Sequence, residues 1–94
     1  MGIFSRRNKD NDYGAWSIKG LALTQLERYE EAIGCYDKAI RINPKDYGTW
    51  HNKGSSLADL KRHEEAIECY TEAIRLNPKN FIAWFNKGNA LAIL

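Results

Sequence analysis

The sequence is poor in the features that mark membrane, nucleic-acid and metal-binding proteins. No run approaches the roughly 18 apolar residues of a membrane span, and 14 basic against 12 acidic residues leave a net charge of only +2. The basic residues are spread along the chain rather than gathered in one patch. The only two cysteines, Cys35 and Cys69, stand at a spacing that matches no zinc or redox signature. These scarcities predict a protein that binds neither membrane, nucleic acid, metal nor cofactor.

Catalytic constellations are also missing from the sequence. It contains no Ser/His/Asp set, no glycine-rich phosphate loop and no paired carboxylates of the kind that general acid–base chemistry needs. The acidic pairs Glu30-Glu31 and Glu64-Glu65 begin expected helices, where the helix dipole favours negative charge. We therefore expect no enzymatic activity.

What the sequence does contain is a repeat of 34 residues. Laying 13–46 over 47–80 gives 20 identities in 34 positions. The same spacing relates three tryptophans, three glycines and three leucines, namely Trp16, Trp50 and Trp84, Gly20, Gly54 and Gly88, and Leu23, Leu57 and Leu91. A fixed period of this length indicates a repeat architecture, in which each unit buries its apolar face against its neighbours. Such an architecture favours binding over chemistry.

Each repeat holds two stretches with helical periodicity. We expect helices over 13–26, 29–42, 47–60, 63–76 and 81–94, with Asp12, Asp46 and Asn80 as caps of the first, third and fifth. Asn-Pro follows the second and fourth, because proline disfavours a helical conformation in the residue before it. Glycine inside a helix costs about 1 kcal/mol relative to alanine. Gly20 and Gly54 therefore predict close helix contacts, with Ala32 and Ala66 as the matching small residues.

The order Trp-x-x-x-Gly-x-x-Leu, Glu-Glu-Ala-Ile-x-x-Tyr, Ala-Ile and Asn-Pro resembles the tetratricopeptide repeat. The resemblance implies an all-α fold, an α-solenoid of antiparallel helix pairs. It assigns 13–46 and 47–80 to two full repeats and 81–94 to one additional helix. Residues 1–12 show no sustained periodicity, and we expect them to form a flexible N-terminal arm. Two departures stand out: Glu27 and Lys61 occupy turn positions where the family usually has glycine, and lysines precede the repeated glycines where leucine is common.

The resemblance implies that the first helix of each pair lines a concave groove that binds a peptide or protein. Residues about 100° around each helix from the inward-facing side then line that groove. Of these, His51 is a candidate hydrogen-bond donor, and asparagine amides can hold a peptide backbone because they both donate and accept. The predicted groove residues are Ser17, Leu21, Thr24, His51, Asn52, Ser55, Asp59, Phe85, Asn86 and Asn89.

The last expected helix carries apolar residues that a complete repeat would cover with a partner helix. A contiguous apolar patch usually marks an interaction site. Two explanations stay open: the chain is a fragment of a longer array, or it associates with itself as a homodimer. If the chain forms a homodimer, self-association is the alternative function. Its predicted interface is Trp84, Phe85, Leu91, Ile93 and Leu94.

Equivalent positions of adjacent repeats hold the two cysteines. Packed helices lie about 8–10 Å apart, whereas a disulfide needs Cα atoms within about 7 Å. We therefore expect Cys35 and Cys69 to be reduced, which favours a cytoplasmic location.

Overall fold

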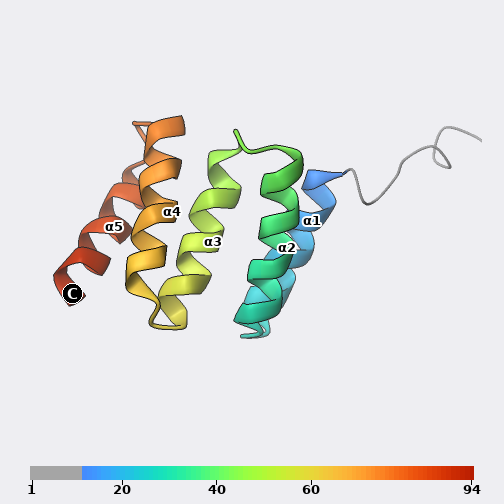
Figure 1. The fold of residues 1–94 in the computed structure, drawn as a ribbon, viewed down its shortest axis with the longest axis horizontal. Coiled ribbons are helices and arrows are strands. Elements are labelled where there is room, and N and C mark those ends of the chain that lie inside the picture. Colours follow the sequence, from blue (N-terminus) through green and yellow to red (C-terminus); the bar gives the residue numbers. More distant parts are fainter. Residues whose placement is uncertain (1–11) are drawn as a thin grey trace, which may run out of the picture.

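The computed structural model describes residues 12–94 as five helices without a strand in that part of the chain. The helices are α1 (Tyr13–Gln25), α2 (Tyr29–Ile42), α3 (Tyr47–Asp59), α4 (His63–Leu76) and α5 (Phe81–Ile93). Figure 1 shows them following one another along the long axis, with α1 and α5 at opposite ends. Each helix packs on the next in the chain. The expected helical-repeat solenoid is confirmed, while the arm predicted for 1–12 lies, except for Asp12, outside the described residues.

The first helix of each repeat is α1, α3 or α5, and two of these three helices begin with a side-chain cap. Asp12 and Asn80 each accept a hydrogen bond from the backbone N–H three residues on, at 3.2 and 3.3 Å. Asp46 is also at the N-cap position, but its side chain makes no such bond. Its carboxylate accepts instead from the Thr49 hydroxyl at 2.7 Å. The prediction of a side-chain cap at Asp46 was wrong because a hydroxyl competes for the carboxylate where the other repeats have alanine.

The helices of each pair turn through a residue with left-handed backbone geometry. Glu27 has φ 60° and Lys61 has φ 66°. In each turn the following residue's N–H closes the helix end, with Arg28 N bonding Leu23 O at 2.9 Å. Side chains rarely adopt this geometry because Cβ crowds the carbonyl oxygen, which costs roughly 1–2 kcal/mol. The structure thus explains why glycine is usual at these two places.

Close helix packing within each pair involves glycine and tyrosine. A Cβ built on Gly20 would lie 2.5 Å from Tyr36 Cε1, and one on Gly54 would lie 2.8 Å from Tyr70 Cε1. The close approach predicted at both glycines is confirmed. The atoms nearest each glycine belong to the tyrosine ring, however, and not to Ala32 or its counterpart in the second repeat. The absence of a side chain at each glycine makes room for a buried ring.

The core runs along the stack as three clusters of buried residues. The first joins α1 to α2, the second is centred on the α3–α4 pair, and the third joins α4 to α5. Trp50 packs against both the second and the third, so it connects adjacent repeats. The cluster members are Leu23, Ala32, Cys35 and Tyr36; Ile33, Leu57, Ala66, Cys69 and Tyr70; and Ala73, Ile74 and Ala83.

Candidate protein-interaction site

Two of the predicted groove side chains, Ser17 and Thr24, take part in hydrogen bonds between helices. Ser17 Oγ lies 2.7 Å from Thr49 Oγ1, which joins α1 to α3. Thr24 Oγ1 lies 3.0 Å from the hydroxyl of Tyr36 and 3.1 Å from Ser56 Oγ. Three helices therefore meet at one cluster of three hydroxyl groups. At the interface between the first two repeats, this cluster fills the space above the buried tyrosine.

The next interface along the stack lacks this hydroxyl cluster. Thirty-four residues further on, alanines replace the other two hydroxyl residues of the cluster, with Ala58 in place of Thr24 and Ala90 in place of Ser56. The hydroxyl of Tyr70 donates instead to Ser55 Oγ at a longer distance of 3.4 Å. The two alanines are smaller, so they leave space above Tyr70. The equivalent space above Tyr36 is filled by the hydroxyl cluster.

A hollow of about 300 Å³ occupies that place between α3, α4 and α5. Four of the ten predicted groove residues line it, and the structure brings them together from α3 and α5: Ser55, Asp59, Asn86 and Asn89. Six other residues complete the wall, among them Ile93, which was also predicted from the sequence for self-association. They are Ala58, Lys61, His63, Tyr70, Ala90 and Ile93.

The wall of the α3–α4–α5 hollow combines an apolar base with polar groups of several kinds. The amides of Asn86 and Asn89 can each donate and accept, and Asp59 and Lys61 bring opposite charges. His63 contributes a ring whose Nδ1 is buried and has no hydrogen-bond partner within residues 12–94. These are groups that can hold a peptide backbone while an apolar side chain enters the hollow.

His63 is a residue whose role in this wall could have been found by comparing the repeats. Its counterpart in the first repeat is Tyr29, a larger ring. The exchange of tyrosine for histidine, together with the two alanines, distinguishes the second interface from the first. Differences between repeats, rather than the residues that they share, therefore locate the hollow.

The other predicted groove histidine, His51, lies outside the wall of the hollow. Its ring packs at a tilt against Tyr70, with the ring centroids 5.7 Å apart. Burial lowers the pKa of His51 below its usual value of 6.5, because the charged imidazolium loses water there. Its Nδ1 is buried without a hydrogen-bond partner in residues 12–94. The imidazole is accordingly neutral at neutral pH.

The remaining predicted groove residues also lie outside the wall of the hollow. Leu21 and Phe85 are exposed, and Asn52 is half-buried. Their contact with a partner stays a prediction.

The last helix, α5, leaves most of its large apolar side chains in water. The five residues predicted for self-association are between 50% and 69% exposed: Trp84, Phe85, Leu91, Ile93 and Leu94. Nothing lies within 4 Å of a Cβ built on Gly88, whereas tyrosine rings crowd the equivalent position of both earlier repeats. The face of α5 that corresponds to a buried helix–helix contact is therefore open.

Both cysteines are buried and carry free thiols. Burial raises the pKa of the Cys69 thiol to about 11. Within residues 12–94, no cluster of three or more His, Cys, Asp or Glu side chains is placed to hold a metal ion. None of the helices in this same part of the chain has the length and apolarity that crossing a bilayer requires.

The fold and its open faces define a helical-repeat protein of the kind that binds other proteins. The family model described as tetratricopeptide repeat matches residues 13–46 and 48–80, and a second model with the same description matches 69–94. The chain belongs to the tetratricopeptide repeat family. Its repeats are generally non-catalytic interaction modules, and membership supports a role as a protein–protein interaction scaffold.

Solved structures of similar fold include two of MamA and the tetratricopeptide repeat domain of Arabidopsis OM64. The two MamA structures are each 25% identical to this chain, with a TM-score of 0.85. Each alignment includes 86% of this chain, and it includes 47% of one MamA chain and 44% of the other. The OM64 domain is 22% identical with a TM-score of 0.83, and 88% of this chain covers 69% of it. The chain thus spans less than half the length of the MamA chains. A comparison with curated proteins gave no match.

Proposed function

We propose that this protein is a non-catalytic scaffold that binds a peptide segment of a partner protein on the face formed by α1, α3 and α5. The observation that carries the proposal is the α3–α4–α5 hollow, which four of the predicted groove residues line. Family membership supports the general role, because tetratricopeptide repeats serve protein–protein interaction.

The dimensions of the hollow fit one anchoring side chain better than a whole small molecule. Its volume of about 300 Å³ is at the lower end of the range for ligand pockets. Ala58 and Ala90 provide a small apolar base, on which an aliphatic side chain would bury its surface. Asn86 and Asn89 would then bond the peptide backbone on either side of that anchor.

Selection from a displayed library of random short peptides tests this proposal. A peptide chosen on the wild-type protein is expected to lose about tenfold in affinity when Asn86→Ala and Asn89→Ala are combined, because two neutral hydrogen bonds are removed. Thr71→Ala, an exposed substitution on α4 that bonds only its own helix, is the matched control and should leave the affinity unchanged. Equal affinities for both variants would refute this placement of the site.

A second candidate function is self-association through the open face of α5. The observation in its favour is the exposure of Trp84, Leu91 and their apolar neighbours beside the uncovered Gly88. We propose that two copies bury these faces against each other as a homodimer, since such a patch on one helix favours association.

Light scattering over a range of protein concentrations tests the dimer. The expected result is a mass of two chains at high concentration, reduced to one chain by Leu91→Glu. Lys79→Gln, an exposed substitution in the turn before α5, makes the same change of charge and is the control. A single-chain mass at every concentration for the wild-type protein would rule the dimer out.

We also propose a cytoplasmic location. The support for it is that both cysteines carry free, buried thiols, which persist most readily in a reducing compartment.

A further inference from the structure

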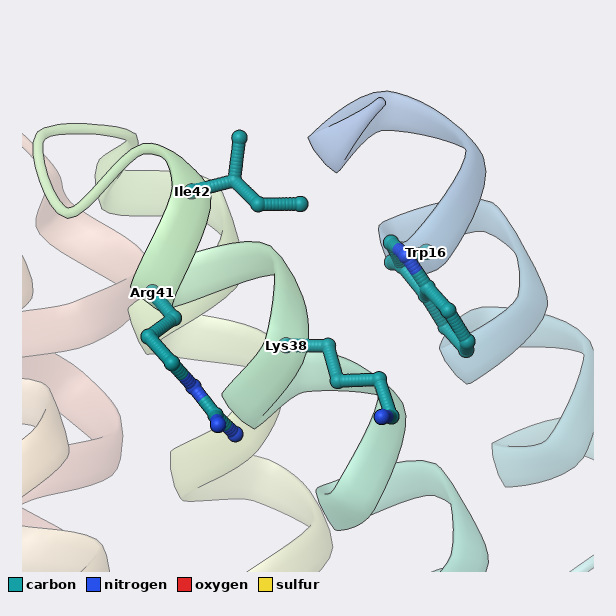
Figure 2. Close-up of a pocket in the computed structure, with 4 residues that line it drawn as sticks. All are labelled: Trp16, Lys38, Arg41 and Ile42. Atoms are coloured by element: carbon teal, nitrogen blue, oxygen red, sulfur yellow. The ribbon is translucent and has the colours of Figure 1, made fainter. Parts of the chain in front are cut away.

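A second hollow lies between α1 and α2, away from the α3–α4–α5 hollow. It has a volume of about 180 Å³ and is lined by Trp16, Lys38, Arg41 and Ile42. Figure 2 shows Trp16 on the α1 side, with Lys38 and Ile42 extending toward it from α2. Lys38 Nζ lies 5.1 Å from the centroid of the Trp16 ring, within cation–π range. The hollow therefore combines an aromatic wall with positive charge.

The Trp16 indole is the first feature that points to a ligand. Its Nε1 is buried and has no hydrogen-bond partner within residues 12–94. The same atom in the other two repeats is satisfied, since Trp50 donates to the Pro44 carbonyl at 2.8 Å and Trp84 donates to the Pro78 carbonyl at 2.9 Å. A buried donor without an acceptor is costly, so this N–H favours an acceptor. The residue that corresponds to Pro44 and Pro78 is residue 10, which lies outside the described part of the chain.

Charge is the second, independent feature. Lys38 and Arg41 form no ion pair with any residue of 12–94. At the equivalent positions of the second repeat stand Glu72 and Arg75, and these bond each other, with Arg75 Nε 3.0 Å from Glu72 Oε2. The second repeat therefore has a Glu–Arg ion pair at these two positions, whereas the first repeat has two cations that form no ion pair within residues 12–94. Lys19 adds a third ammonium, 5.5 Å from the same indole ring.

We propose that the α1–α2 hollow binds the carboxylate of an acidic side chain on a partner peptide. Trp16 Nε1–H, the Lys38 ammonium and the Arg41 guanidinium are all hydrogen-bond donors, and the four lining side chains contain no hydrogen-bond acceptor. The Trp16 ring and Ile42 form apolar walls, which favour a carboxylate carried on an aliphatic stem over a bare inorganic anion. The volume admits one such side chain rather than a chain of phosphates.

This contact is separate from the groove, so the proposed function does not depend on it. A peptide of alternating Glu and Leu, blocked at both ends, is the probe, and the indole N–H signals of the three tryptophans are followed by NMR. The Trp16 signal is expected to shift as the peptide is added, while the Trp50 and Trp84 signals stay in place. The same peptide with Gln for Glu should bind at least tenfold more weakly, because charge-assisted hydrogen bonds are lost.

A substitution that copies the second repeat provides the decisive variant. Lys38→Glu would pair with Arg41 as Glu72 pairs with Arg75, and it should lower the affinity for the Glu-Leu peptide at least tenfold while retaining helical circular dichroism. Lys45→Glu makes the same change of charge at an exposed turn position and should lower it less than threefold. Equal losses in both variants, an unmoved Trp16 signal, or equal binding of the Gln peptide would each overturn the proposal. Inorganic phosphate that shifts Trp16 as strongly as the peptide would overturn the choice of ligand.

Discussion

The packing of Gly20 under the Tyr36 ring leads to a prediction about alanine substitutions at equivalent positions of different repeats. Gly20→Ala should destabilise the fold, whereas Gly88→Ala, at the equivalent place in the third repeat, should not. The reason is local: the new Cβ would lie 2.5 Å from Tyr36 in the first case, and would have nothing within 4 Å in the second. Gly34, also within a helix and with nothing within 4 Å, is the mid-helix control.

The expected magnitudes follow from two opposing terms. Alanine gains about 1 kcal/mol over glycine in a helix interior. At Gly20 this gain is outweighed by about 1–3 kcal/mol of overpacking, and by loosening of the hydroxyl bonds of the buried Tyr36, worth about 0.5–1.5 kcal/mol each. Gly20→Ala should therefore lower the free energy of unfolding by about 1–3 kcal/mol, and Gly34→Ala should raise it by about 0.5–1 kcal/mol.

Urea unfolding followed by helical circular dichroism measures these differences. Gly88→Ala is expected to be neutral or stabilising, because Gly88, like Gly34, lies inside its helix with nothing within 4 Å of the new Cβ. If Gly20→Ala proved as stable as Gly34→Ala, the tyrosine ring would have room to move, and the explanation for the repeated glycine would be refuted.

Three further predictions concern the turns, the hydroxyl cluster and a buried thiol. Glu27→Gly and Lys61→Gly should each raise the free energy of unfolding by about 0.5–1 kcal/mol, because relief of left-handed strain exceeds the added chain entropy of glycine; unchanged urea midpoints would contradict this. Tyr36→Phe should cost more stability than Tyr70→Phe, since the first hydroxyl lies 3.0 Å from Thr24 Oγ1 and the second lies 3.4 Å from Ser55 Oγ; thermal unfolding compares them, and the reverse order would be evidence against this explanation. Because burial raises the pKa of Cys69 from 9.0 to about 11, stability should be intact below pH 9 and fall toward pH 11 more steeply than in Cys69→Ala; parallel pH profiles would argue against it.

The fold was predictable because a few residues with strong local preferences recur at a fixed spacing. Helical periodicity and the Asn-Pro stops predicted an α2 ending near Ile42 and an α4 ending near residue 76, as observed. The close approach at Gly20 was predicted from its cost inside a helix, although the partner is Tyr36 rather than Ala32. Prediction from local sequence preferences succeeds where one interaction determines the local structure.

The site was less predictable because it depends on competition between groups and on space left unfilled. The Asp46 side-chain cap was wrong because Thr49 competes for the carboxylate. Ser17 was predicted to line the groove, but its hydroxyl lies 2.7 Å from Thr49 Oγ1 on another helix. The α3–α4–α5 hollow arises because Ala58 and Ala90 replace the hydroxyl residues of the first interface. This is a difference between repeats, and a search for residues that the repeats share does not find it.

A peptide bound at the α3–α4–α5 hollow would change the surroundings of the backbone amides of α3 and α5. Backbone amide NMR of the 94-residue protein, with and without a peptide selected from the random library, detects such changes residue by residue. The largest shifts are expected on Ser55, Asn86 and Asn89, with little change along the exposed side of α2 or α4. Shifts confined to that opposite side, or spread evenly over all five helices, would contradict binding at this hollow.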